Sequence, residues 1–156
     1  LKCKSDFELV ADYESLYSGN LISNREAFSG KKALTNSEHQ YLNLIKDLSL
    51  DCFGRVRLKL RFAIKSKGGS FPSLVISQKE ITDELENEIL TKTFLLNESN
   101  PDFVKSDKEG WYFFEFGFWF DKSVHMNSKQ NIDVYLFDNS AGQFFVDDLE
   151  IELREF

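Results

Sequence analysis

The chain has 156 residues, a length that suits one domain, and a net charge of −7. Its 16 Phe, 5 Tyr and 2 Trp make it rich in aromatic side chains, which favour β-strands. The acidic balance argues against nucleic-acid binding, and no apolar run approaches the ~18 residues of a membrane span.

Nine short strands are predicted from alternating apolar residues and the turn signals between them. They lie at Phe7–Glu14, Lys31–Asn36, Tyr41–Leu50, Arg55–Lys65, Ser73–Gln78, Ile89–Asn97, Trp111–Phe120, Ile132–Phe137 and Gln143–Arg154. Between Gln78 and Ile89 we expect a loop that could hold a short helix, because Ser77 and Glu80 fit a capping box. This pattern predicts an all-β sandwich of two sheets in a single domain spanning residues 1–156.

The strand at 111–120 is apolar on both faces. One face carries Tyr112, Phe114, Phe116, Phe118 and Phe120, which we assign to the core. The other face carries Trp111, Glu115 and Trp119, which could form a platform for a sugar ring, with a carboxylate to accept from sugar hydroxyls. Alternatively, a loop or a neighbouring domain covers this face.

Four basic residues alternate along the strand at 55–65, at Arg55, Arg57, Lys59 and Arg61. Carboxylates on neighbouring strands could pair with them, and the candidates are Glu115, Asp133, Glu150 and Glu152. Alternatively, Arg57 and Arg61 recognise an acidic sugar or polymer beside the Trp platform.

The C-terminal stretch 133–153 is predicted to be a hairpin with a period of two in its second arm. By parity Asp147 falls on the apolar face, with Phe145 and Leu149. A buried carboxylate is costly unless it is paired or bound to a metal. Calcium takes carboxylate and carbonyl oxygens, and Glu14 with carbonyls near Gly30 could complete its shell. A salt bridge to Lys31 or Lys32, or bonds from backbone N–H groups, would satisfy Asp147 equally well.

No pattern of catalytic residues is present. His39 and His125 fit neither a nucleophile nor a zinc arrangement, and Asp147 and Asp148 are adjacent and so cannot face one bond as a glycosidase pair. Cys3 and Cys52 are too few for a disulfide scaffold, and they form either one bridge or two thiols. We therefore expect no enzymatic activity.

Four segments follow one another along the chain: DYES at Asp12–Ser15, AFSGKKAL at Ala27–Leu34, GWYFFEF at Gly110–Phe116 and VYLFDNSAGQFFVDDLEIEL at Val134–Leu153. In this order they resemble the galactose-binding-like jelly rolls, in particular the carbohydrate-binding modules appended to xylanases and glucanases. The resemblance implies an all-β jelly-roll β-sandwich with a structural Ca²⁺. On that basis Glu14 and Asp147 match the family's acidic ligands, and Lys31 matches the loop whose carbonyls complete the shell.

The leading prediction is a non-catalytic carbohydrate-binding accessory module of an exported or cell-surface protein. Its ligand would be a glycan, held by Trp111, Trp119, Glu115, Arg57 and Arg61. The alternative is a structural or protein-interaction module of a larger surface protein, with no sugar ligand.

Overall fold

The structure is a computed structural model, and it describes residues 2–5, 21–23, 27–30, 33–36, 39–49, 55–83, 85–121, 129–138 and 142–155. Eleven strands lie in this part of the chain. They are β1 (Lys2–Ser5), β2 (Leu21–Ser23), β3 (Ala33–Thr35), β4 (Tyr41–Ser49), β5 (Arg55–Ser66), β6 (Ser73–Thr82), β7 (Leu85–Leu95), β8 (Phe103–Lys105), β9 (Trp111–Asp121), β10 (Lys129–Phe137) and β11 (Phe144–Glu155).

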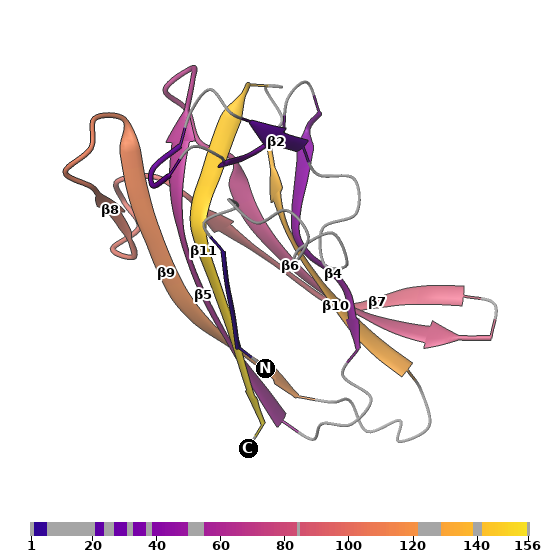
Figure 1. The fold of residues 1–156 in the computed structure, drawn as a ribbon. Helices are drawn as coiled ribbons and strands as arrows, with labels where there is room; N and C mark the ends of the chain where they lie inside the picture. Colours follow the sequence, from indigo (N-terminus) through magenta and orange to yellow (C-terminus); the bar gives the residue numbers. More distant parts are fainter. Residues whose placement is uncertain are drawn as a thin grey trace.

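The strands form two antiparallel sheets that pack as layers (Figure 1). The seven-stranded sheet has the order β2-β3-β11-β5-β9-β8, with β1 also paired to β11. The four-stranded sheet has the order β4-β10-β6-β7. The two-sheet all-β sandwich predicted from the sequence is therefore confirmed. Among the described residues, the structure has no helix with the length and hydropathy that crossing a membrane would require.

The main core lies between the inner faces of the sheets, as the alternation predicts. The largest fully buried side chains include Phe62, Phe114, Phe120 and Phe144. The inner face of β9 is as predicted, since Phe114, Phe116 and Phe120 are buried and Tyr112 and Phe118 pack against the same cluster. Phe94 of β7 lies against Phe116 with ring centroids 5.1 Å apart, which joins one sheet to the other.

Two predictions about the elements are wrong. Instead of a loop or helix, the segment between Gln78 and Ile89 completes a long hairpin in which β6 runs to Thr82 and β7 begins at Leu85. The stretch 133–153 is not a hairpin, because β10 pairs with β4 and β6 whereas β11 pairs with β5, β3 and β1. The strand predicted at Phe7–Glu14 lies outside the described residues.

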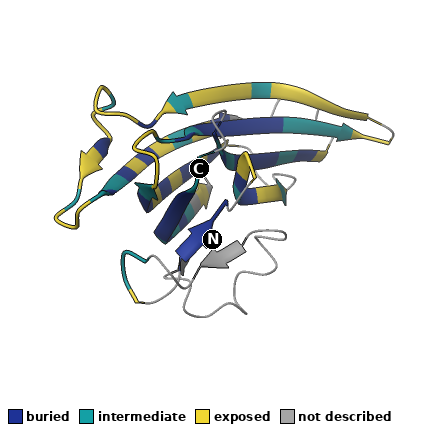
Figure 2. Ribbon diagram, turned by 90° about the horizontal axis from the view of Figure 1, so that it is seen from above, coloured by how far each residue is buried: buried dark blue, intermediate teal, exposed yellow. Residues whose placement is uncertain are grey.

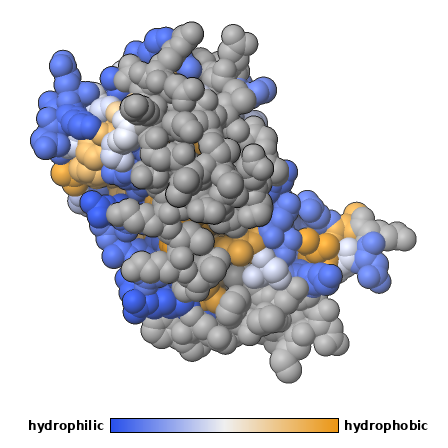
Figure 3. Space-filling model, viewed as in Figure 1, coloured by the Kyte–Doolittle hydropathy of each residue, from blue (hydrophilic) through white to orange (hydrophobic). Residues whose placement is uncertain are grey.

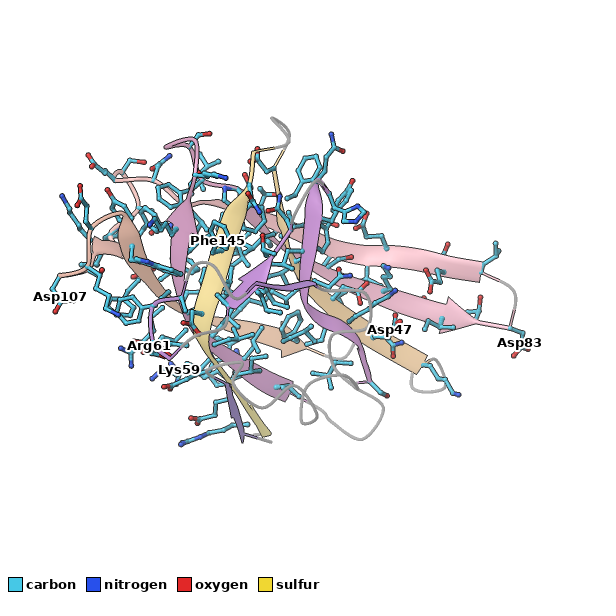
Figure 4. The ribbon with its side chains drawn as sticks, turned by 45° about the horizontal axis from the view of Figure 1, so that its top comes forward. Asp47, Lys59, Arg61, Asp83, Asp107 and Phe145 are labelled. Atoms are coloured by element: carbon cyan, nitrogen blue, oxygen red, sulfur yellow. The ribbon has the colours of Figure 1, made fainter. Side chains whose placement is uncertain are left out.

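Viewed from above, β7 forms an exposed edge along nearly its whole length (Figure 2). The tip of its hairpin with β6 projects beyond the layers, at Asp83 (Figure 4). Leu85 near this tip is 65% exposed.

The outer faces of the two sheets, turned away from the core, are the broad surfaces on which a binding site can be built.

Candidate functional site

The carboxylate of Asp147 is buried on β11 and accepts three backbone hydrogen bonds. The N–H groups of Phe28 and Ser29 donate to its Oδ2 at 2.8 and 2.9 Å, and the N–H of Asp148 donates to Oδ1 at 2.8 Å. Its side chain has no exposed surface. The burial predicted for Asp147 is confirmed, and bonds from backbone N–H groups are the partners that the described residues supply.

Burial is the main influence on the acidity of this group. It raises the pKa of Asp147 to about 6, against the opposing effect of the N–H groups of Ser29, Asp148 and Phe28, which stabilise the carboxylate. The neighbouring carboxylate of Asp148 adds to the rise.

The reason for the burial differs from the predicted one. A β-bulge interrupts the pairing of β11 with β5 between Asp147 and Glu150, and Asp148 there has a positive φ of 48°. The bulge reverses the parity of the strand, so Leu149 and Ile151 join the main core whereas Phe145 and Asp147 lie on the outer face. Residues 27–30 cover that part of the outer face.

The calcium site stays a prediction of the sequence. Glu14 and Lys31 lie outside the described residues, as does Lys32. Within the described ranges, no group of three or more His, Cys, Asp or Glu side chains is placed to hold a metal ion.

Trp111 does not form an exposed platform. It is only 3% exposed and belongs to a small second core with Ala33, Ala63 and Phe145. The ring of Phe28 packs against it with centroids 5.7 Å apart. The sugar platform of two tryptophans is therefore wrong, and coverage by a loop, the alternative considered for this face, is what the structure shows at Trp111.

Trp119 lies at the uncovered end of the same face and is 39% exposed. The guanidinium group of Arg55 lies 4.5 Å from its ring centroid, and that of Arg57 lies 5.8 Å away. Cations held over an aromatic face occupy the surface on which a sugar ring would stack. Trp119 is thus better placed to orient arginines than to bind a sugar directly.

The predicted charge pairing across the strands is partly confirmed. Lys59 forms an ion pair with Glu115 at 2.9 Å, and Arg61 lies opposite Glu115 on β9 and Glu150 on β11. Arg61 also lies over the ring of Phe113, 5.4 Å from its centroid. Asp133 takes no part in this pairing, because it belongs to the other sheet.

A group of aromatic side chains lies on the outer face of the four-stranded sheet. The ring centroid of Tyr41 on β4 lies 4.8 Å from that of Phe137 and 5.7 Å from that of Tyr135, both on β10. Tyr41 is 55% exposed. Asn43 lies opposite Tyr135 in the register of β4 and β10 and adds an amide to the same face. We call Tyr41, Asn43, Tyr135 and Phe137 the aromatic cluster.

Polar and charged groups continue this face along β10, β6 and β7. Lys79 forms an ion pair with Asp133 at 2.7 Å, and this bond is the main cause that raises the pKa of Lys79. The hydroxyl of Ser77 donates to Glu88 at 3.0 Å, and hydroxyl donors, Thr91 first and then Ser77, lower the pKa of Glu88. Asp133 also accepts from the N–H of Asp47 at 2.7 Å. The face thus combines exposed aromatic carbon with fixed hydrogen-bonding groups.

Both strands of the aromatic cluster are predicted from the sequence, but the cluster itself is not. The signal was present in β10, where Tyr135 and Phe137 alternate with the core residues Val134 and Leu136. Nothing in the sequence placed β4 beside β10, however, and that pairing brings Tyr41 to the other two rings.

Comparison with solved structures finds several carbohydrate-binding modules among the similar chains, all at low sequence identity. The chain is similar to a family 16 carbohydrate-binding module-2, at 16% identity and a TM-score of 0.48, with 97% of this chain and 90% of that chain covered. It is similar to a CBM28 module specific for non-crystalline cellulose, at 15% identity and a TM-score of 0.47, with 87% and 86% covered. It is also similar to CBM27-1 of Caldicellulosiruptor saccharolyticus in complex with mannohexaose, at 15% identity and a TM-score of 0.40, with 97% of both chains covered.

No protein-family model and no curated protein sequence matches the chain.

Proposed function

We propose that this chain is a non-catalytic carbohydrate-binding module and that it binds a neutral glycan on the outer face of its four-stranded sheet. The observation that carries the proposal is the aromatic cluster, in which three rings from two strands meet at the surface. Sugar rings present apolar C–H faces that pack on aromatic rings, and their hydroxyls need fixed polar partners. Asn43 and the exposed carboxylate of Glu88 are polar groups on the same face.

The charge of this face favours a neutral ligand. Glu86, Glu88 and Asp133 carry three negative charges on it, whereas Lys79 and Lys129 carry two positive charges. A carboxylated or sulfated glycan would meet like charge there. In this proposal the chain is an accessory module of an exported or cell-surface protein, where polysaccharides are accessible.

The experiment that tests the proposal is binding to a panel of neutral polysaccharides, followed by titration with an oligosaccharide of the best ligand. We expect Tyr41→Ala to weaken binding about tenfold or more, because a central aromatic anchor typically contributes over 1 kcal/mol. Trp119→Ala, on the opposite sheet, is the matched control and should retain the affinity. Unchanged affinity in both Tyr41→Ala and Phe137→Ala would exclude this face as the site.

The alternative function, a structural or protein-interaction module, is favoured by exposed apolar side chains on β7. Leu85 and Leu95 are 65% and 60% exposed, and Ile89 is 40% exposed. A folded chain that binds none of the neutral polysaccharides would support this alternative.

A further inference from the structure

The outer face of the seven-stranded sheet carries a cluster of cations beyond the part that residues 27–30 cover. In the strand register, Arg57 on β5 lies between Arg154 on β11 and Trp119 on β9. In the next row Lys59 lies between Glu152 and Gly117. Lys59 and Arg61 project from the same side of β5 (Figure 4). In Figure 3 the described surface at the lower left of the molecule is hydrophilic.

Arg57, Lys59, Glu152 and Arg154 line a hollow of about 200 Å³ in this face, which we call the cationic hollow. Of the described residues that line it, three are cations and one is a carboxylate, although the whole chain carries a net charge of −7. The concentration of positive charge is thus local to this hollow.

The partners of these cations differ. Lys59 pairs with Glu115, and Arg154 pairs with Glu152. In the described part of the chain no carboxylate forms an ion pair with Arg57, whose guanidinium lies near the Trp119 ring instead. Arg57 and Arg154 lie at directly opposite positions, where like charges repel. Glu152 pairs with Arg154, so Arg57 is the cation of the hollow that an anionic ligand would meet.

We propose that the cationic hollow is a second binding site, which takes the carboxylate or sulfate group of an acidic glycan. Arginine binds such groups through two parallel N–H bonds, and Arg57 held against Trp119 is oriented in advance. Arg61 lies four residues further along β5, about 13 Å away at ~3.3 Å per residue, so an extended chain can reach both arginines. This site lies on the opposite side of the sandwich from the aromatic cluster and does not depend on it.

The test uses polygalacturonate as the carboxylated probe and dextran sulfate as the sulfated probe, with unmodified dextran as the neutral control. We expect the intact chain to bind one of the two anionic probes, and Arg57→Gln to weaken that binding about tenfold, as for loss of a charge-assisted bond. Lys92→Gln on β7 removes the same charge from the other sheet and should change the affinity less than twofold.

A second variant is expected to bind the anionic probe more tightly, a result that misfolding cannot produce. Among the described residues that line the cationic hollow, Glu152 is the one carboxylate. Glu152→Gln should tighten binding of the anionic probe about twofold to fivefold, because it removes the repulsion of one partly exposed charge.

Three results would overturn the proposal: no binding of either anionic probe, an equal loss in Arg57→Gln and Lys92→Gln, or binding of single-stranded DNA as tight as that of the acidic glycan. Without binding of either probe, the cations would be an ordinary solvated face. An equal loss in both variants would mean that binding depends on overall charge, and tight binding of DNA would mean that the hollow accepts any polyanion. Tyr41→Ala and Arg57→Gln act on opposite faces, so failure of one site is distinguishable from failure of the other.

Discussion

Asp147 shows how one residue can be buried for a reason that its position in the sequence does not reveal. Its carboxylate fastens residues 27–30 onto the outer face of the larger sheet through the N–H groups of Phe28 and Ser29. Loss of this acceptor would leave buried N–H donors without partners, which costs about 1–3 kcal/mol each. The covering of Trp111 by Phe28 depends on the same attachment.

The raised pKa of Asp147 gives a pH dependence of stability whose sign is fixed. Its folded value of about 6 exceeds the ordinary value of 3.8, so between pH 4 and 6 the folded state binds the proton more tightly than the unfolded chain. The contribution of Asp147 to the free energy of unfolding therefore falls as the pH rises through this range, by on the order of 3 kcal/mol, and is constant above it.

Denaturant unfolding at pH 4 and pH 7 checks this expectation. Asp147→Asn has no such titration, so the difference in free energy between it and the unsubstituted chain should change between the two pH values. Parallel pH profiles for the two proteins would contradict the prediction.

The calcium prediction is tested in the same samples. A chelator would lower the melting temperature, and added Ca²⁺ would restore it, only where a bound ion stabilises the fold.

At the scale of the element, the bulge in β11 decides which side chains of that strand form the main core. Before the bulge the even-numbered Phe144 and Val146 face the main core, and after it the odd-numbered Leu149 and Ile151 do. The hydroxyl of Ser29 donates to Asp148 at the bulge, so the covering segment and the bulge support each other.

The positive φ of Asp148 makes the bulge sensitive to the residue type. Asp148→Val should lower the free energy of unfolding by about 1–3 kcal/mol, because a β-branched residue is strained in the left-handed region. Asp148→Gly adopts this φ without strain but also loses the bond to Ser29, so it separates the two contributions. Chemical denaturation of the two variants measures the difference, and equal losses would show that the backbone conformation contributes little.

At the scale of the whole molecule, stability comes from apolar packing between the sheets. Leu136 of β10 is fully buried in the main core, whereas Leu85 of β7 is 65% exposed. Leu136→Ala should therefore lower the free energy of unfolding by about 2–5 kcal/mol, and Leu85→Ala by about 0.5 kcal/mol or less. Denaturant unfolding of both variants compares the same chemical change at two depths, and similar losses would contradict the assignment of the core.

The arrangement of the sheets also separates two surfaces of different chemistry. The aromatic cluster and its acidic neighbours lie on the outer face of the four-stranded sheet, and the cationic hollow lies on that of the seven-stranded sheet. A neutral and an acidic glycan can thus be bound independently in the functions proposed.

The sequence by itself determined the class of fold and most of the strands. Alternation of apolar and polar residues depends only on the period of two along an extended chain, so β5 and the core face of β9 could be predicted from local pattern. The burial of Asp147 also followed from its apolar neighbours, although the predicted face was wrong.

Only the tertiary structure decided the strand pairing, and with it the candidate sites. Pairing joins residues far apart in sequence, so the pattern within one strand cannot show that Tyr41 meets Phe137 or that Arg57 lies opposite Arg154. The bulge at Asp148 and the cover over Trp111 depend in the same way on contacts between distant segments. Local sequence fixes which side chains alternate, whereas long-range packing fixes which of them remain exposed and what they face.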